Sequence, residues 1–389
     1  MAHFSTDILI LGGGIAGLWL NARLRRLGYA SLVLESSYLG GGQTVKSQGI
    51  IHGGTKYALQ GILTGSSEAI AEMPKRWRAA LQGAGELDLS GVRVLSKAHY
   101  LWSPGSLASN LTSFFASKAM RGRVTATAGK DLPLPLQNPA FKGRVYALDE
   151  LVLDVPSLIQ RLVQLCGDSL IQAQHLEPFY QDQQLSGVVV EGQVIQAQRI
   201  VLCAGAGNAD LLDQLALTQP HMQTRPLHMV LVKAPSLQPL YAHCLGVGPK
   251  PRITITSHPT ADGQWLWYLG GDLAEAEGVA RDSAAQIHQA RRELEQLLPW
   301  LDLSQSQWAT LRIDRAEPAQ SGLVRPDNAF LSEQGRLLIG WPTKLALAPD
   351  LSDRVLNALE AAQIRPQASV IRPNLPVPSV SPPFWEGLL

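Results

Sequence analysis

The chain has 389 residues, of which 46% are hydrophobic, and its 33 basic residues nearly balance its 32 acidic ones. This length predicts two domains or one large domain with an ample core. The balanced charge gives no support for nucleic acid or an anionic membrane surface as a partner. No basic stretch opens the N-terminus and no run of about 18 apolar residues follows it, so we expect a cytoplasmic protein without a transmembrane segment.

The first strong pattern is a glycine motif between a predicted strand and a predicted helix. An apolar run over residues 8–11 predicts a buried parallel strand, and Gly12, Gly14 and Gly17 follow before a helix predicted over 18–27. Gly12 permits a tight turn, Gly14 leaves room for a pyrophosphate, and Gly17 allows close packing of helix and strand. The amides at the start of the helix would bind the phosphates.

The motif continues into a second apolar strand, predicted over 31–34, which ends at the acidic residue Glu35. An acid about 20 residues after the glycines hydrogen-bonds a ribose diol and would repel a 2′-phosphate. The pattern therefore favours FAD or NAD over NADP. A second GxGxxG is absent from the sequence, which disfavours a reductase with its own nicotinamide domain.

Further elements follow in chain order. Glycines and small polar residues predict a loop over 40–54, helical periodicity covers 66–82, and the pattern over 87–102 indicates strands. An acidic turn at 149–154 leads into an amphipathic helix that extends to about residue 165. Short strands are then predicted over 169–176, 187–190 and 194–197.

The segment 199–207 resembles a second nucleotide-facing turn, because an apolar strand ends in small residues before a predicted helix over 209–215. Alternating strands dominate 222–271 and indicate a separate antiparallel sheet. The last predicted elements are a helix over 284–298, a strand over 336–340 and a helix over 350–362. The Pro-rich tail after Arg365 is either extended along the surface or disordered.

The cysteines Cys166, Cys203 and Cys244 lie far apart, with no CxxC or other metal-ligand spacing. This spacing fits a reducing compartment and excludes a redox-active cysteine pair. We expect all three to be core residues, and we expect no metal site.

Four segments together resemble the superfamily of FAD enzymes that contains glycine oxidase, sarcosine oxidase and D-amino-acid oxidase. They are the glycine motif with Glu35, residues 153–159, the turn at 200–212, and residues 337–349, and the similarity extends from end to end of the chain. The resemblance implies FAD as the cofactor. It also implies an α/β fold in which a Rossmann-like FAD-binding domain is interleaved with an antiparallel-sheet substrate domain.

This resemblance implies the domain limits and the cofactor-binding residues. The FAD-binding domain would comprise 1–80, 145–220 and 325–365, the substrate domain 81–144 and 221–324, and the Pro-rich tail 366–389. The residues implied at the cofactor are Gly12, Gly14, Ile15, Ala16, Gly17, Glu35, Ser36, Gln43, Thr44, Ser47, Gln48, Gly49, Leu176, Ala204, Gly205, Gly340, Lys344 and Leu345.

Residues 47–54 are similar to a loop of the L-2-hydroxyglutarate and glycerol-3-phosphate dehydrogenase branches. The similarity implies that this loop passes the isoalloxazine ring and that His52 lies near it. An imidazole that titrates near neutral pH can take a hydroxyl or amine proton during hydride transfer. Stabilisation of the reduced flavin, a covalent bond to it, or simple ordering of the loop are the alternatives.

Residues 340–347 depart from the family pattern. They lack the glycines that present backbone amides to the flavin in family oxidases, and Pro342 removes a further donor. The ammonium of Lys344 would replace those donors near the N1/C2 region of the flavin, and the alternative is a surface cation. This departure weakens the case for oxygen as the electron acceptor.

Arginines are the candidates for binding an anionic substrate head, because a guanidinium forms two hydrogen bonds with a carboxylate. Arg315 is the first choice, since it precedes the strand and loop that return to the flavin. Arg252, Arg312 and Arg325 are the other candidates, and for each of the four the alternative is a solvated or salt-bridged side chain.

Aromatic side chains are further candidates for the substrate pocket. Alternation places Trp265 and Trp267 on one face of a predicted sheet and Tyr268 on the other. The resemblance implies that this sheet covers the substrate, whereas core packing is the simpler role of each side chain. Tyr57, beyond the His52 loop, is a further candidate.

The sequence therefore predicts an FAD-dependent oxidoreductase that takes a hydride from a small amino acid, amine or 2-hydroxy acid. His52, Arg315 and Lys344 are the catalytic candidates, and oxygen or another electron acceptor would reoxidise the flavin. The alternatives are an FAD-binding, non-catalytic subunit with a partner subunit in a larger dehydrogenase, and an NAD-dependent dehydrogenase.

Overall fold

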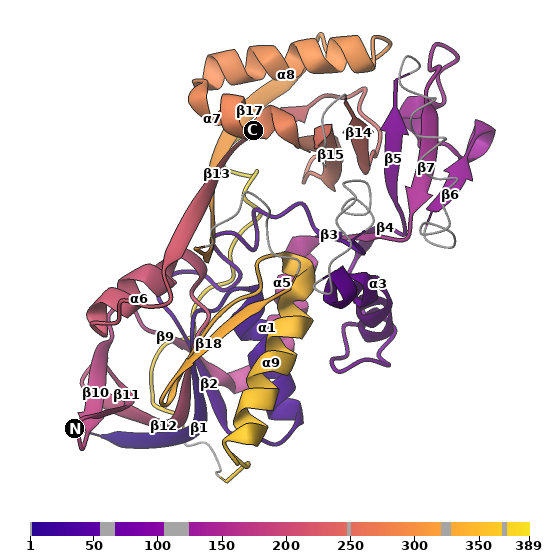
Figure 1. The fold of residues 1–389 in the computed structure, drawn as a ribbon. Coiled ribbons are helices and arrows are strands. Elements are labelled where there is room, and N and C mark those ends of the chain that lie inside the picture. The colour runs from indigo at the N-terminus through magenta and orange to yellow at the C-terminus, as the bar shows by residue number, and fades with distance from the viewer. Residues whose placement is uncertain (1, 55–66, 105–123, 247–249, 320–327, 368–371) are drawn as a thin grey trace.

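The computed structural model describes the chain except for residues 1, 55–66, 105–123, 247–249, 320–327 and 368–371. Two large sheets lie at opposite ends of the molecule (Figure 1). The chain passes back and forth between them, so each sheet contains strands from several separate segments of the sequence. The α/β fold with a second, antiparallel sheet is thereby confirmed.

The first sheet is mainly parallel and starts at the N-terminus. β1 (His3–Leu11) pairs in parallel with both β2 (Ser31–Glu35) and β12 (Gln193–Leu202), and β12 pairs in parallel with β19 (Leu337–Trp341). Its other strands are β9 (Leu170–Gln172), β10 (Glu177–Gln181), β11 (Gln184–Val190) and β18 (Phe330–Gln334). Both faces of the second half of β1 are buried, which explains the continuous apolar run over residues 8–11.

Three helices cover one face of this sheet (Figure 1). They are α1 (Ile15–Arg26), α5 (Val155–Cys166) and α9 (Ala348–Ala361). Ile8 and Ile10 of β1 pack against their apolar side chains, whereas Leu9 and Leu11 point to the opposite face. α5 begins where Asp154 accepts a hydrogen bond from the Ser157 amide at 3.1 Å, as expected of an N-terminal cap.

The second sheet is mainly antiparallel, in the order β17-β13-β16-β15-β14-β5-β7-β6. Its strands are β5 (His99–Ser103), β6 (Val124–Thr127), β7 (Arg144–Leu148), β13 (Met222–Lys233), β14 (Ala242–Leu245), β15 (Pro251–Pro259), β16 (Trp265–Gly270) and β17 (Gln307–Pro318). Helix α8 (Ser283–Leu297) covers one face, where Ala290 and Leu294 share a core with Trp267.

A small sheet of β3 (Ile50–Ile51), β8 (Leu151–Leu153) and β4 (Val94–Ser96) lies between the two large sheets (Figure 1). The other helices in the described residues are α3 (Ser67–Leu81), α6 (Asn208–Gln214), α7 (Ala276–Ala280) and short 3₁₀ helices at Gly129–Asp131, Leu134–Leu136, Gly167–Ser169, Gly205–Gly207, Asp272–Ala274 and Leu345–Leu347.

The structure differs from the predicted elements in several places. β3 lies in a segment predicted as a loop, and β6, β10 and β18 lie where no strand was predicted. β17 lies in a segment for which no strand was predicted, and its whole length pairs with β13. β7 belongs to the second sheet although it extends past residue 145, where the predicted FAD-binding domain resumes. Residues 87–93 contain no strand, because Leu87 and Leu89 enter the core on either side of a turn in which Asp88 accepts the Ser90 amide.

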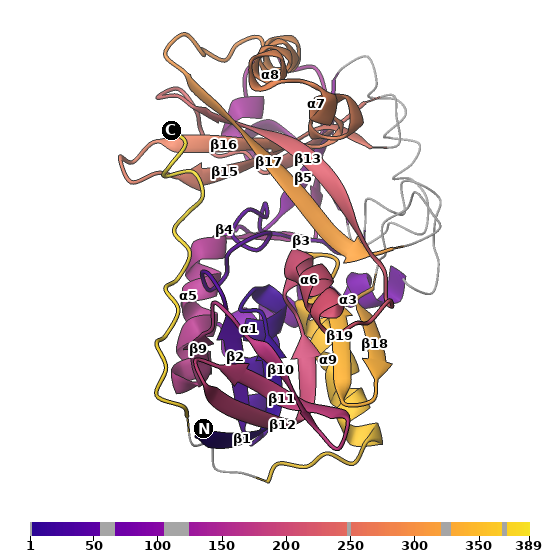
Figure 2. The same ribbon diagram turned by 90° about the vertical axis from the view of Figure 1, so that its left-hand side faces the viewer.

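The C-terminal segment is extended and runs from the first sheet to the second along one side of the molecule (Figure 2). Leu39 donates its amide to the Ser379 carbonyl at 2.9 Å and accepts the Ser381 amide at 2.9 Å. Beyond this contact, Phe384 packs on Tyr268 and Trp385 packs on His258. The segment therefore connects the two large sheets.

We expect Trp385→Ala to lower the free energy of unfolding by about 3 kcal/mol, because the substitution empties a buried aromatic site. Trp385 is 5% exposed, whereas Val377 in the same segment is 53% exposed. Val377→Ala is therefore the control and should change the stability by less than about 0.5 kcal/mol. Urea unfolding followed by circular dichroism gives the free energy of unfolding of each variant. Equal values for Trp385→Ala and Val377→Ala would contradict the packing of Trp385.

Candidate active site

The site begins at the carboxyl ends of β1 and β12, where two backbone turns meet. Gly12 has a φ of +112°, and a Cβ on it would lie 2.6 Å from the Cα of Ala204. The Cys203 amide donates to the Leu11 carbonyl at 2.8 Å and fixes the two turns against each other. Only glycine fits position 12, because any side chain there would separate the turns.

Helix α1 starts directly after this turn. A Cβ on Gly17 would lie 1.9 Å from the Gly12 carbonyl oxygen, so this contact agrees with the packing role predicted for Gly17. The Ile15 amide donates to the Thr44 hydroxyl at 3.0 Å, which joins the loop over 40–44 to the start of the helix. The amides of the first turn have no partners within the helix, so they and the helix dipole favour an anion here.

Glu35, at the end of β2, lies beside the same turn. Its Oε2 accepts the Gly13 amide at 2.7 Å, and its Oε1 accepts the Ser37 amide at 2.8 Å. These two bonds hold the carboxylate in place, and each oxygen has a further lone pair for a hydroxyl donor. A ribose diol offers two such donors.

One cavity of about 1720 Å³ extends from these turns to the second sheet. This exceeds the roughly 300–1,000 Å³ of a usual small-molecule pocket and leaves room for a dinucleotide together with a substrate. The predicted site residues that line it are Gly12, Gly14, Ile15, Ala16, Glu35, Ser36, Gln43, Thr44, Ser47, Gln48, Gly49, His52, Leu176, Ala204, Gly205, Arg315, Lys344 and Leu345.

Two predicted site residues, Gly17 and Gly340, lie behind the cavity wall. A Cβ on Gly340 would lie 2.8 Å from a methyl carbon of Leu351, and the Gly340 carbonyl accepts the side-chain amide of Asn208 at 3.3 Å. Gly340 thus allows α9 to approach β19. The absence of a side chain at this position therefore serves helix packing. The sequence motif alone does not distinguish this packing role from a contact with the flavin.

The closing loop after β19 lines the cavity through residues 341–345. The indole of Trp341 donates to the Gly205 carbonyl at 2.9 Å and joins this loop to the second turn. Lys344 is 8% exposed and lines the cavity, so the alternative of a surface cation is not supported. Thr343, with a φ of +60°, adopts the left-handed backbone conformation within this loop.

The loop around Gln48 is held by the second sheet. The Gln48 side-chain amide donates to the Tyr268 carbonyl at 3.1 Å, and the Tyr268 hydroxyl donates to the Lys46 carbonyl at 3.1 Å. Trp265 and Trp267 lie on the opposite face of β16, in the core beneath α8. All three aromatics therefore pack and position rather than line the cavity, and Tyr57 lies outside the described residues.

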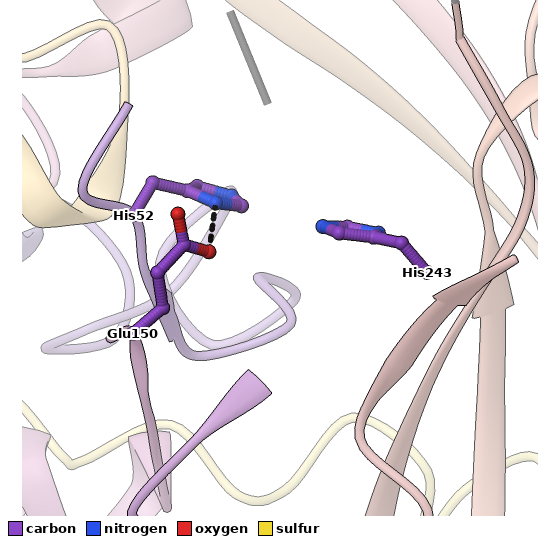
Figure 3. A group of neighbouring side chains, drawn as sticks. All are labelled: His52, Glu150 and His243. Carbon is purple, nitrogen blue, oxygen red and sulfur yellow. Dashed lines mark hydrogen bonds and ion pairs between the residues drawn. The ribbon is translucent and has the colours of Figure 1, made fainter. Parts of the chain in front are cut away.

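His52 follows β3 and lines the cavity. Its Nδ1 lies 3.3 Å from Oε2 of Glu150, and the two side chains face His243 of β14 across a gap (Figure 3). The rings of His52 and His243 are nearly parallel, at 9°, with centroids 6.1 Å apart. Sequence analysis did not single out Glu150 or His243, because strand pairing brings both from distant segments.

The four predicted arginines have different surroundings. Arg315 lines the cavity, with its Nε 3.3 Å from the Arg225 carbonyl and a guanidinium nitrogen 3.8 Å from Glu275. Arg312 also lines the cavity and donates to two carbonyls near α7, whereas Arg252 pairs with Glu293 away from the cavity. Arg325 lies outside the described residues.

Other cations line the cavity that sequence analysis missed. Arg225 lies opposite Arg315 in the β13–β17 pairing and is paired with the buried Glu317. Lys250 is paired with Glu275, which also faces Arg315. The register of β13 with β17, which joins segments about 90 residues apart, produces this cluster, and no local sequence signal indicates it.

The cysteines are free and buried, as predicted. Burial raises the pKa of Cys203 to about 12 and that of Cys166 to about 11, so their thiols stay protonated at neutral pH. Among the described residues, no helix is both long and apolar enough to cross a membrane.

Comparison with known proteins identifies the family. Residues 7–366 match the family described as FAD dependent oxidoreductase, DAO, and the chain belongs to it. The chain is 67% identical over 382 residues to a probable FAD-dependent oxidoreductase of Pseudomonas aeruginosa, PA4991, with 98% of each chain covered. The crystal structure of PA4991 superposes with a TM-score of 0.89, at 61% identity, and covers 100% of this chain and 99% of that one.

Two more distant structures share the fold. Glycine oxidase from Geobacillus kaustophilus has a TM-score of 0.67 at 17% identity, covering 94% of this chain and 100% of its own. A glycerol-3-phosphate dehydrogenase from Bacillus halodurans, complexed with FAD, has a TM-score of 0.58 at 13% identity, covering 94% and 66%. The protein is therefore an FAD-dependent oxidoreductase of the DAO family.

We expect Gly17→Ala to weaken FAD binding by at least about tenfold, or about 1.4 kcal/mol, because a Cβ there would push α1 away from the turn. Gly387→Ala is the control, since a Cβ at Gly387 would meet no atom within 4 Å. Fluorescence titration of the flavin-free protein with FAD measures both affinities. Equal affinity of the two variants would contradict the tight packing of α1 on the first turn.

Proposed function

We propose that this protein oxidises a small amino acid, amine or 2-hydroxy acid by removing a hydride from its Cα–H. The observation that carries the proposal is the continuity of one cavity, whose lining includes the α1 turn and Glu35 as well as His52 and Arg315. A dinucleotide held at the α1 turn and Glu35 has room to extend along this cavity. The neighbours' names, which include glycine oxidase and glycerol-3-phosphate dehydrogenase, support substrates with either an amine or a hydroxyl.

The proposed division of labour follows the two sheets, except that β7 of the second sheet extends past residue 145. The ranges 1–80, 145–220 and 325–365 would form the FAD-binding domain, and 81–144 with 221–324 the substrate domain. Bound FAD supplies the two-electron acceptor. Glu35 would accept the ribose hydroxyls, and the start of α1 would face the pyrophosphate.

The chain's own residues would then handle charge and protons. His52 would take the proton from the substrate amine or hydroxyl as the hydride leaves the carbon, giving an imine or a keto product. Arg315 would hold the substrate carboxylate. The ammonium of Lys344, buried at the cavity wall, would stabilise negative charge on the reduced flavin.

Anaerobic visible spectra of the purified protein test this function. The panel contains D- and L-amino acids, N-methyl glycines, 2-hydroxy acids and glycerol 3-phosphate. Bleaching of the flavin bands by one class is the expected result, and admission of oxygen or a quinone afterwards identifies the acceptor. Bands that persist with every compound would contradict the proposal and favour a non-catalytic subunit.

We expect Arg315→Ala to weaken the binding of a carboxylate substrate by about tenfold to a hundredfold, the loss of one charged hydrogen-bonding partner. Arg252→Ala is the matched control, because Arg252 pairs with Glu293 away from the cavity. Stopped-flow flavin reduction at varied substrate concentration gives the apparent Kd of each variant. An equal loss in both variants, or an equal loss with neutral amines, would contradict the carboxylate-binding role of Arg315.

A further inference from the structure

The pairing of β3 with β8 places His52 and Glu150 side by side. Ile51 lies opposite Leu151 in this antiparallel pair, so the next residue on each strand, His52 and Glu150, continues the pairing beyond the last registered positions. The neighbouring side chains make contact there, with Nδ1 of His52 3.3 Å from Oε2 of Glu150. The backbone register of β3 and β8 therefore fixes this contact.

The carboxyl group of Glu150 is buried. Its side chain is 1% exposed, and its second oxygen, Oε1, accepts the Gly53 amide at 3.0 Å. Burial opposes ionisation of this carboxyl, but the hydrogen bond with His52, the charges of His52 and His99 and the Gly53 amide together lower its pKa below the ordinary value. A charged carboxylate is costly to bury unless a partner compensates it, and His52 is the partner that contacts it.

Two further histidines, His243 and His99, lie near this pair. His243, 2% exposed, faces His52 from β14, and its own Nδ1 lies 2.8 Å from the Thr254 hydroxyl. His99 of β5 packs on His243, with ring centroids 4.2 Å apart. Glu150, His243 and His99 are thus titratable groups that the structure places near His52.

We propose that Glu150 is a positioning residue that holds His52 as a proton acceptor facing the cavity. The carboxylate accepts the Nδ1 proton, which fixes the tautomer and leaves the lone pair on Nε2. The negative charge also stabilises the imidazolium that forms when Nε2 takes a proton from a substrate N–H or O–H. This role rests on the proposed function, but the contact between the His52 and Glu150 side chains does not.

Two features distinguish this proposal from a metal site formed by His52, Glu150 and His243. The candidate ligand atoms of the three residues lie within 4.8 Å of one another, so this distance alone admits an ion. However, the Nδ1 of His52 already lies at hydrogen-bond distance from Glu150, so the contact between these two side chains needs no ion. One buried carboxylate balances one imidazolium, whereas a divalent ion would leave a net positive charge on this enclosed group.

The pairing is tested by the pKa of His52, measured by NMR on the FAD-loaded protein with ¹³C-labelled histidine. His52→Ala assigns the signal among the nine histidines. We expect Glu150→Gln to lower the pKa of His52 by about one unit or more, because a neutral amide no longer favours the imidazolium. Glu150→Asp should retain most of the wild-type value, and Glu293→Gln, which removes a carboxylate from the Arg252 pair, should leave it unchanged.

The positioning role is tested by the pH profile of flavin reduction with the substrate that bleaches the flavin. A base must be neutral to act, so its rate rises with pH through its pKa. Because Glu150→Gln lowers that pKa, its ascending limb should move to lower pH, which a merely structural role would not produce. An unshifted His52 pKa or an unshifted limb would overturn the proposal.

Metal analysis of the purified protein tests the alternative that His52, Glu150 and His243 bind a metal ion. Stoichiometric zinc, iron or manganese in the wild-type protein that is lost from Glu150→Gln would overturn the proposal, since the three side chains would then be ligands. Failure of every compound to bleach the flavin would count against the proposed function alone. The NMR titration needs no substrate, so the two failures are distinguishable.

Discussion

The site depends on one contact, between the turn after β1 at Gly12 and the turn after β12 at Ala204. Gly12 approaches the backbone of Ala204 so closely that a Cβ has no room, and the Cys203 amide binds the Leu11 carbonyl beside it. This contact aligns the carboxyl ends of β1 and β12. Trp341 then fixes the closing loop after β19 to the turn that contains Ala204 and Gly205, through the Gly205 carbonyl. The position of α1, and therefore of any phosphate bound at its start, follows from these backbone contacts.

The second sheet completes the cavity because the chain crosses between the sheets repeatedly. Gln48 and Tyr268 exchange hydrogen bonds with each other's segments, and the C-terminal segment adds a connection through Leu39 and Trp385. The loop that carries His52 is thus held from both sides. Rigid support of this kind is what alignment of a C–H bond with a cofactor requires, since small displacements cost large factors in rate.

Local patterns in the sequence were enough to predict the nucleotide-binding part of the fold. Strand, glycines, helix and Glu35 follow one another within 35 residues, so chain order itself places them together. Gly340 shows the limit of motif transfer, because its lack of a side chain serves packing against Leu351. Glu150, His243 and Arg225 were missed for another reason. Pairings between distant strands bring His243 and Arg225 to the cavity and Glu150 against His52, and such pairings leave no local periodicity to detect.

The central claim is that one cavity holds FAD with its ribose at Glu35 and its ring system beside His52. A crystal structure of the FAD-loaded protein tests this claim most directly. We expect hydrogen bonds from the ribose hydroxyls to the Glu35 carboxylate, the pyrophosphate at the start of α1, and the isoalloxazine ring in contact with the His52 loop and Lys344. A ring system that points away from His52, or a ribose that does not reach Glu35, would contradict the account.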